Sequence, residues 1–119
     1  MRHLESQLQQ DCVKWFRYQY PDIAKLLFAV PNGGRRGKFE AAIMQGEGVT
    51  PGVSDCILLV PKREFAALCI EFKRGKGKQT DLQKQWQELA EKHGNKYVVC
   101  RSFEEFTNQI NDYLKLNHQ

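Results

Sequence analysis

The sequence DCILLVPKREFAALCIEFK, residues 55–73, decides the fold, because it holds two β-rich runs joined by a short polar connection. The runs occupy residues 55–60 and 65–73, and the PKRE segment between them is typical of a hairpin. If the hairpin turns about Arg63, Asp55 pairs with Glu71 on one face of the sheet. Side chains alternate along a strand, so Lys73 is expected on the same face as Glu71.

This pairing brings two carboxylates and a lysine together at one end of a sheet. Like charges that lie opposite one another are destabilising unless something neutralises them. A divalent cation does so well, since Mg²⁺ prefers carboxylate oxygens and keeps several waters. The alternative is structural: Asp55 is a strand-edge residue after a turn, and Glu71 and Lys73 form an exposed charged pair.

The segments before the hairpin predict two helices and a strand. Residues 3–19 have apolar side chains at helical spacing, and Pro21 is expected to end that helix. Residues 26–30 predict a short strand that runs into a glycine-rich loop. Residues 38–45 predict a short helix before a second glycine-rich turn, GEGVTPG.

The segments after the hairpin predict helix, strand and helix. Residues 80–93 form a helix that Gly94 ends, and residues 96–101 form a strand. Ser102 and Glu105 form a capping box for a last helix that runs to about residue 116. The order predicts an α/β fold in one domain, residues 1–119, with a central mixed sheet of about four strands flanked by helices.

Composition narrows the class of protein. The hydrophobic fraction of 41% suffices for a core, and the formal net charge of +4 favours a polyanionic partner. No apolar run reaches the roughly 20 residues that span a bilayer, and the N-terminus lacks a secretory signal. We therefore expect a soluble cytoplasmic protein without membrane contact. The glycine-rich stretches lack P-loop spacing, which argues against a nucleotide cofactor.

The four cysteines are expected to be buried, reduced thiols. None forms a CxxC pair, and three lie within apolar runs. A disulfide framework or a zinc site is therefore not expected. The cysteines are Cys12, Cys56, Cys69 and Cys100.

PGVSD at residues 51–55, followed by IEFK at residues 70–73, resembles the signature of the PD-(D/E)XK nucleases, which have a restriction-endonuclease-like core. Pro51 stands apart from the strict Pro-Asp dipeptide of that signature. More closely, the chain resembles a stand-alone VRR-NUC domain. The matching segments, in order, are an early helix with Glu5, then VPNGG, GVTPGVSD, IEFKRGKGK and TDLQKQW.

The resemblance implies a role for each residue of the site. Asp55, Glu71 and the backbone carbonyl of Phe72 hold Mg²⁺, for which Mn²⁺ can substitute. Glu5 contacts the metal directly or through water. Lys73 positions the attacking water or offsets charge at the phosphate.

Gln83 has two explanations that the sequence leaves open. The resemblance makes it a catalytic glutamine near the metal. Thr80 and Gln83 also form a capping box, which accounts for the glutamine through backbone hydrogen bonds alone. Gln79 and Gln87 have weaker claims to a role in the site.

Two basic segments flank the predicted site, and both are expected to contact DNA phosphates. The alternative is an ordinary solvated surface. The residues concerned are Arg35, Arg36, Lys38, Arg74, Lys76 and Lys78.

The resemblance implies a Mg²⁺-dependent, structure-selective DNA endonuclease that acts as a homodimer on four-way Holliday junctions, in a bacterial cell or a phage-infected host. A dimer supplies one active site for each of two strands. The alternatives are a flap nuclease, a sequence-specific duplex nuclease and a catalytically silent DNA-binding module of the same fold.

Overall fold

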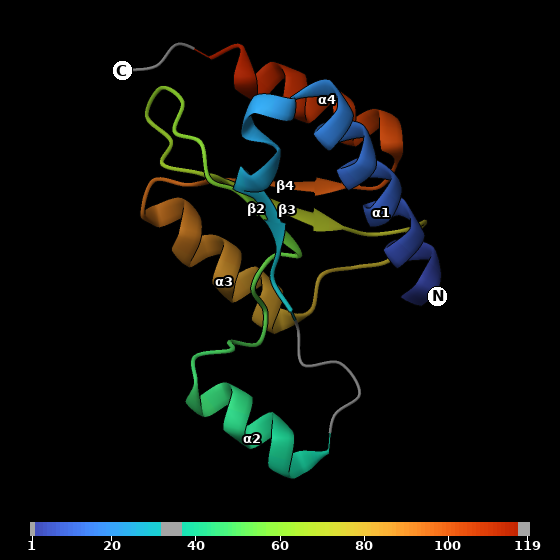
Figure 1. Ribbon diagram of the computed structural model, residues 1–119. Helices are drawn as coiled ribbons and strands as arrows, with labels where there is room; N and C mark the ends of the chain where they lie inside the picture. The colour runs from blue at the N-terminus through green and yellow to red at the C-terminus, as the bar shows by residue number, and fades with distance from the viewer. Residues whose placement is uncertain (1, 32–36, 117–119) are drawn as a thin grey trace.

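The computed structural model describes residues 2–31 and 37–116 of the protein. Its elements follow one another in the predicted order, with one additional 3-10 helix (Figure 1). They are α1 (Arg2–Gln19), the 3-10 helix η1 (Pro21–Leu26), β1 (Leu27–Ala29), α2 (Lys38–Gly46), β2 (Cys56–Leu58), β3 (Leu68–Phe72), α3 (Asp81–Lys92), β4 (Lys96–Cys100) and α4 (Phe103–Leu114).

The four strands form one mixed sheet in the order β1-β2-β3-β4, as predicted. β1 pairs with β2 and β2 with β3 in antiparallel fashion, whereas β3 and β4 are parallel. Within the hairpin Cys56 pairs with Ile70 and Leu58 with Leu68. This is the predicted register, and it brings Asp55, the residue just before the start of β2, to the level of Glu71.

Helices cover both faces of the sheet (Figure 1). α1 and α4 pack together on one face, and α3 packs on the other. All five residues of β3 are buried, which is typical of a strand covered on both faces. The central strand is therefore shielded from water along its whole length, including the position of Glu71.

The main core lies between the sheet and the pair α1 and α4. Leu8, Cys12 and Phe16 of α1 meet Phe106 and Ile110 of α4 there. Their helical spacing places all of them on the inner faces of the two helices.

All four cysteines are buried and free, as predicted. Burial raises the pKa of Cys12, Cys56 and Cys100 to about 12, so these thiols stay protonated and act as small apolar side chains.

Two predictions about the strands need correction. Residues 21–26 form η1 before the first strand, because Pro21 and the acidic Asp22 occupy its first turn. The hairpin strands are shorter than predicted: β2 ends at Leu58 and β3 begins at Leu68. Pro61 lacks a backbone N–H, and Arg63 has a φ of 55° in the tight turn that Lys62 and Phe65 close.

The predicted helix ends agree with the structure, with one correction. Gly94, with a φ of 89°, follows the last turn of α3. The Ser102 hydroxyl accepts the N–H of Glu105 at 3.0 Å, as a helix cap does. The Glu105 carboxylate, however, accepts the N–H of Arg101 at 2.6 Å, so the reciprocal bond of a capping box goes to the preceding residue.

α2 lies beyond the end of the sheet, next to the start of α3 (Figure 1). It contributes no buried residue, and Phe39 in its first turn is 79% exposed. Across residues 2–31 and 37–116, no helix is both long and apolar enough to span a membrane.

The turn that leads into Asp55 is fixed by Gly52. Its φ is 92°, and a Cβ added there would lie 2.6 Å from the Leu82 carbonyl oxygen of α3. Glycine therefore permits both the left-handed backbone and the close approach of the turn to the helix.

We expect Gly52→Ala to lower the free energy of unfolding by about 1–3 kcal/mol, because it combines an unfavourable φ with a backbone clash. Urea denaturation followed by circular dichroism measures the change. Gly48→Ala is the matched control, since Gly48 has a φ of 108° but open space around its Cα. If the two variants lose equal stability, the contact with Leu82 contributes nothing.

Candidate active site

Glu71 is the centre of the candidate site. It is 1% exposed, on the face of β3 that α3 covers. Its Oε1 accepts hydrogen bonds from the Tyr97 hydroxyl and from Gln79 Nε2, the latter at 3.1 Å. Its Oε2 has no hydrogen-bond partner among the described residues. A buried carboxylate oxygen without a partner is costly and marks a place for a positive group.

Asp55 lies at the entrance to β2, half-buried, beside Glu71. Its Oδ2 accepts the backbone N–H of Phe72 at 2.7 Å. Burial raises the pKa of Asp55, and the negative charges of Glu71 and Glu5 add to the rise. The Phe72 N–H and Lys73 act in the opposite direction. The two carboxylates of the hairpin thus share one site, as their spacing predicted.

Lys73 and Glu5 complete this charged group. Lys73 Nζ lies 3.6 Å from Glu71 Oε2, too far for a hydrogen bond but close enough for an ion pair. The structural alternative of an exposed pair is therefore wrong for Glu71 and Lys73, since both side chains are largely buried. Glu5 approaches from α1, and a Cβ on Gly77 would lie within 3.9 Å of Glu5 Oε2 and 3.7 Å of Lys73 Cδ.

The donors fit a hard divalent cation. Asp55 and Glu71 offer carboxylate oxygens, the chemistry that Mg²⁺ prefers, and Glu71 Oε2 is unpartnered. Within residues 2–31 and 37–116, no three histidine, cysteine, aspartate or glutamate side chains converge as a ligand cluster. The contact of Glu5 with the metal, directly or through water, and the part of the Phe72 carbonyl therefore stay predictions. The Asp55 and Glu71 carboxylates are the donors that lie together.

Tyr97 and Gln79 contact the site. From the sequence, Gln79 had only a weak claim to this role, and Tyr97 was not singled out. Tyr97 lies on β4, and burial together with its bond to Glu71 raises the pKa of its hydroxyl. Gln79 precedes α3 and also donates to Gln87 Oε1 at 2.8 Å. Tyr97 has no local signal, because only the parallel pairing of β3 with β4 brings it beside Glu71.

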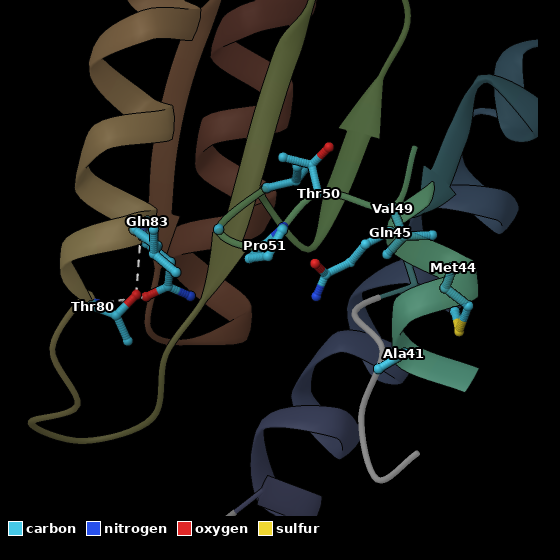
Figure 2. Close-up of a pocket in the computed structure, with 11 residues that line it drawn as sticks. Ala41, Met44, Gln45, Val49, Thr50, Pro51, Thr80 and Gln83 are labelled. Carbon is cyan, nitrogen blue, oxygen red and sulfur yellow. Dashed lines mark hydrogen bonds between the residues drawn. The ribbon is translucent and has the colours of Figure 1, made fainter. Parts of the chain in front are cut away.

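Gln83 caps α3 in this structure. Its Oε1 accepts the Thr80 N–H at 2.8 Å, and the Thr80 hydroxyl accepts the Gln83 N–H at 3.2 Å. Both residues line a cavity of about 340 Å³, and Figure 2 shows them among its lining side chains. α2, the turn at residues 49–53 and the start of α3 line this cavity. Gln79, rather than Gln83, is the glutamine that contacts Glu71.

The basic loop after β3 is exposed beside the carboxylates. Arg101 at the end of β4 donates to the carbonyl oxygens of Gly75 and Gly77 at 3.0 and 2.7 Å, which ties the loop to the sheet. Lys38 is exposed at the start of α2, and Arg35 and Arg36 lie outside the described residues. The exposed cations of the loop are Arg74, Lys76 and Lys78.

A mixed four-stranded sheet with helices on both faces, and two carboxylates and a lysine at one end of its inner strands, is consistent with a restriction-endonuclease-like fold. The model of the VRR-NUC domain family matches residues 3–104, so the chain belongs to the VRR-NUC family. Membership supports a nuclease function with DNA as the substrate, in a family whose nucleases generally use divalent metals.

A solved structure described as "VRR_NUC domain protein" is similar to this chain. The TM-score is 0.83 at 25% sequence identity, and the match covers 96% of this chain and 90% of the other. A comparison with curated proteins finds no match.

The paired carboxylates predict a gain in stability when one charge is removed. In EDTA, we expect Asp55→Asn to raise the melting temperature by about 4 °C, or about 1 kcal/mol, because repulsion with Glu71 disappears while the amide oxygen still accepts the Phe72 N–H. Differential scanning calorimetry measures the change.

Asp11→Asn is the matched control. Asp11 is exposed, and its carboxylate also accepts an N–H, in this case from the Gln7 side chain at 3.0 Å. Its melting temperature should not change. Added Mg²⁺ should stabilise wild type and leave Asp55→Asn unaffected. A destabilised Asp55→Asn in EDTA would show that repulsion is not the dominant effect.

Proposed function

We propose that this chain is a Mg²⁺-dependent endonuclease that hydrolyses phosphodiester bonds in branched DNA. The observation that carries the proposal is the convergence of Asp55, Glu71 and Lys73 at one end of the central strands. Glu71 Oε2 is buried there and has no hydrogen-bond partner among residues 2–31 and 37–116. Membership of the VRR-NUC family supports nuclease chemistry for this group of residues. We also propose that residues 1–119 act as one domain, in the cytoplasm of a bacterial cell or of a phage-infected host.

Each residue of the proposed active site has its own role. Asp55, Glu71 and the Phe72 carbonyl would hold the cation, and Glu5 would contact it directly or through water. The bound cation supplies Lewis-acid stabilisation of the phosphate and lowers the pKa of water. Lys73 orients the attacking water or offsets charge on the phosphate oxygens. The water oxygen bonds to phosphorus, the bond from phosphorus to the leaving sugar oxygen breaks, and that oxygen takes up a proton.

DNA phosphates are held by cations of two basic segments, one before Asp55 and one after Glu71 in the sequence. The loop after β3 carries exposed cations, and Arg101 holds its backbone through the carbonyl oxygens of Gly75 and Gly77. Phosphate contacts fix the register of the duplex without sequence information. The proposed contacts are Arg35, Arg36, Lys38, Arg74, Lys76 and Lys78.

Branched DNA is the proposed substrate because this family resemblance points to junction-resolving enzymes that work as homodimers. A two-fold dimer places one site on each of two strands of a four-way junction. A flap nuclease, a sequence-specific duplex nuclease and a catalytically silent DNA-binding module are the competing functions. The intact trio of Asp55, Glu71 and Lys73 favours catalysis over a silent module.

Cleavage of matched four-way junction, flap, single-stranded and linear duplex DNA tests the proposal. We expect junction cutting in Mg²⁺ or Mn²⁺ and none in EDTA. Asp55→Ala should abolish cleavage, and Lys73→Ala should lower the rate about 10²–10⁴-fold because a positioned charge or proton donor is lost.

Lys92→Ala is the control for Lys73, since Lys92 is exposed at the far end of α3 and should leave the rate unchanged. Flap cutting alone would keep the chemistry and exclude the resolvase function. Junction binding without any cleavage would support the silent DNA-binding module.

The dimer is tested separately, by sedimentation equilibrium at micromolar concentration. We expect twice the monomer mass of 13.8 kDa. A monomeric mass, with or without junction DNA, would exclude the dimeric resolvase and leave the nuclease chemistry untouched.

A further inference from the structure

The two oxygens of Glu71 have different surroundings. Oε1 accepts hydrogen bonds from both the Tyr97 hydroxyl and Gln79 Nε2. A carboxylate oxygen has about two lone-pair sites, so these two donors occupy Oε1 fully. Oε2 accepts none from the described part of the chain, and Lys73 Nζ lies 3.6 Å from it. One oxygen is thus engaged by the protein and the other is left for a cation.

Both donors are themselves held in place. Tyr97 is 7% exposed, and its ring packs against Trp86 of α3 with centroids 6.1 Å apart. Gln79 donates to Gln87 Oε1 at 2.8 Å, and Gln87 donates to Glu91 at 3.3 Å. A chain of hydrogen bonds along α3 fixes the orientation of the Gln79 amide.

We infer that Tyr97 and Gln79 are positioning residues that restrict Glu71 to a single-oxygen ligand, which makes the site select Mg²⁺ against Ca²⁺. The inference rests on the proposed function, in which Glu71 holds a divalent cation. Mg²⁺ requires near-octahedral geometry and is satisfied by single oxygens. Ca²⁺ takes six to eight ligands and accepts a carboxylate through both oxygens. Engaging Oε1 within the protein denies Ca²⁺ the second oxygen.

Isothermal titration of the full chain with Mg²⁺ and with Ca²⁺, without DNA, tests this inference. We expect Tyr97→Phe to weaken Mg²⁺ binding about tenfold, the usual effect of removing a group that orients a ligand. Ca²⁺ binding should be unchanged or tighter, because Oε1 becomes available. Gln79→Met should shift the ratio of the two affinities in the same direction, by less, since one donor remains.

Tyr113→Phe is the matched control. Tyr113 is also a buried tyrosine, and its hydroxyl donates to the Val60 carbonyl at 2.6 Å, from α4 on the opposite face of the sheet. The affinity ratio should match wild type in this variant even if stability falls. If Tyr97→Phe does not fold by circular dichroism, Gln79→Met, which changes a half-exposed residue, carries the test.

The possible outcomes distinguish the selectivity inference from the proposed function on which it rests. Equal weakening of Mg²⁺ and Ca²⁺, or an unchanged ratio in the folded variants, overturns the selectivity inference alone. Absence of cation binding in wild type, or binding that survives Asp55→Ala, overturns the proposed function. A shifted ratio in Tyr97→Phe or Gln79→Met, with Tyr113→Phe unchanged, supports the inference.

Discussion

The structure depends on burying a carboxylate, Glu71, in a strand that is covered on both faces. A buried charge is costly unless it is paired and hydrogen-bonded. Tyr97, Gln79 and Lys73 approach it from β4, from the start of α3 and from the end of β3. Their placement requires the parallel β3–β4 pairing and α3 on that face. Side chains from three parts of the fold thus compensate the charge of Glu71, and the compensation is only partial.

The hairpin could be predicted because its signals are local. Two β-rich runs separated by four polar residues leave few registers, and the period of two assigns each side chain to a face. The pairing of Cys56 with Ile70 followed from that constraint. Helix limits were predictable for the same reason, since caps such as Thr80 and Ser102 act on their own next turn.

The remainder depends on contacts between distant parts of the chain. Tyr97 is 26 residues from Glu71, and nothing near it in sequence reveals that it donates to a carboxylate. Gln79 and Gln83 lie on one short stretch with equal chemistry, yet the cap engages Gln83 and leaves Gln79 to reach the site. η1 was missed because no side chain caps its start and Ile23 departs from helical backbone angles within it. Tertiary packing, rather than propensity, decided these cases.

The same packing couples the carboxylates to the basic loop. Arg101 follows directly after β4, the strand that carries Tyr97, and it holds the loop through the carbonyls of Gly75 and Gly77. Gly77 in turn lies close to Lys73 and Glu5. A shift of β4 would therefore disturb both the donor to Glu71 and the anchor of the loop. β4 thus helps to hold both the Glu71 carboxylate, which suits a cation, and the basic loop, whose cations suit phosphate. The spacing between carboxylate and loop is therefore set by the sheet rather than by a free loop.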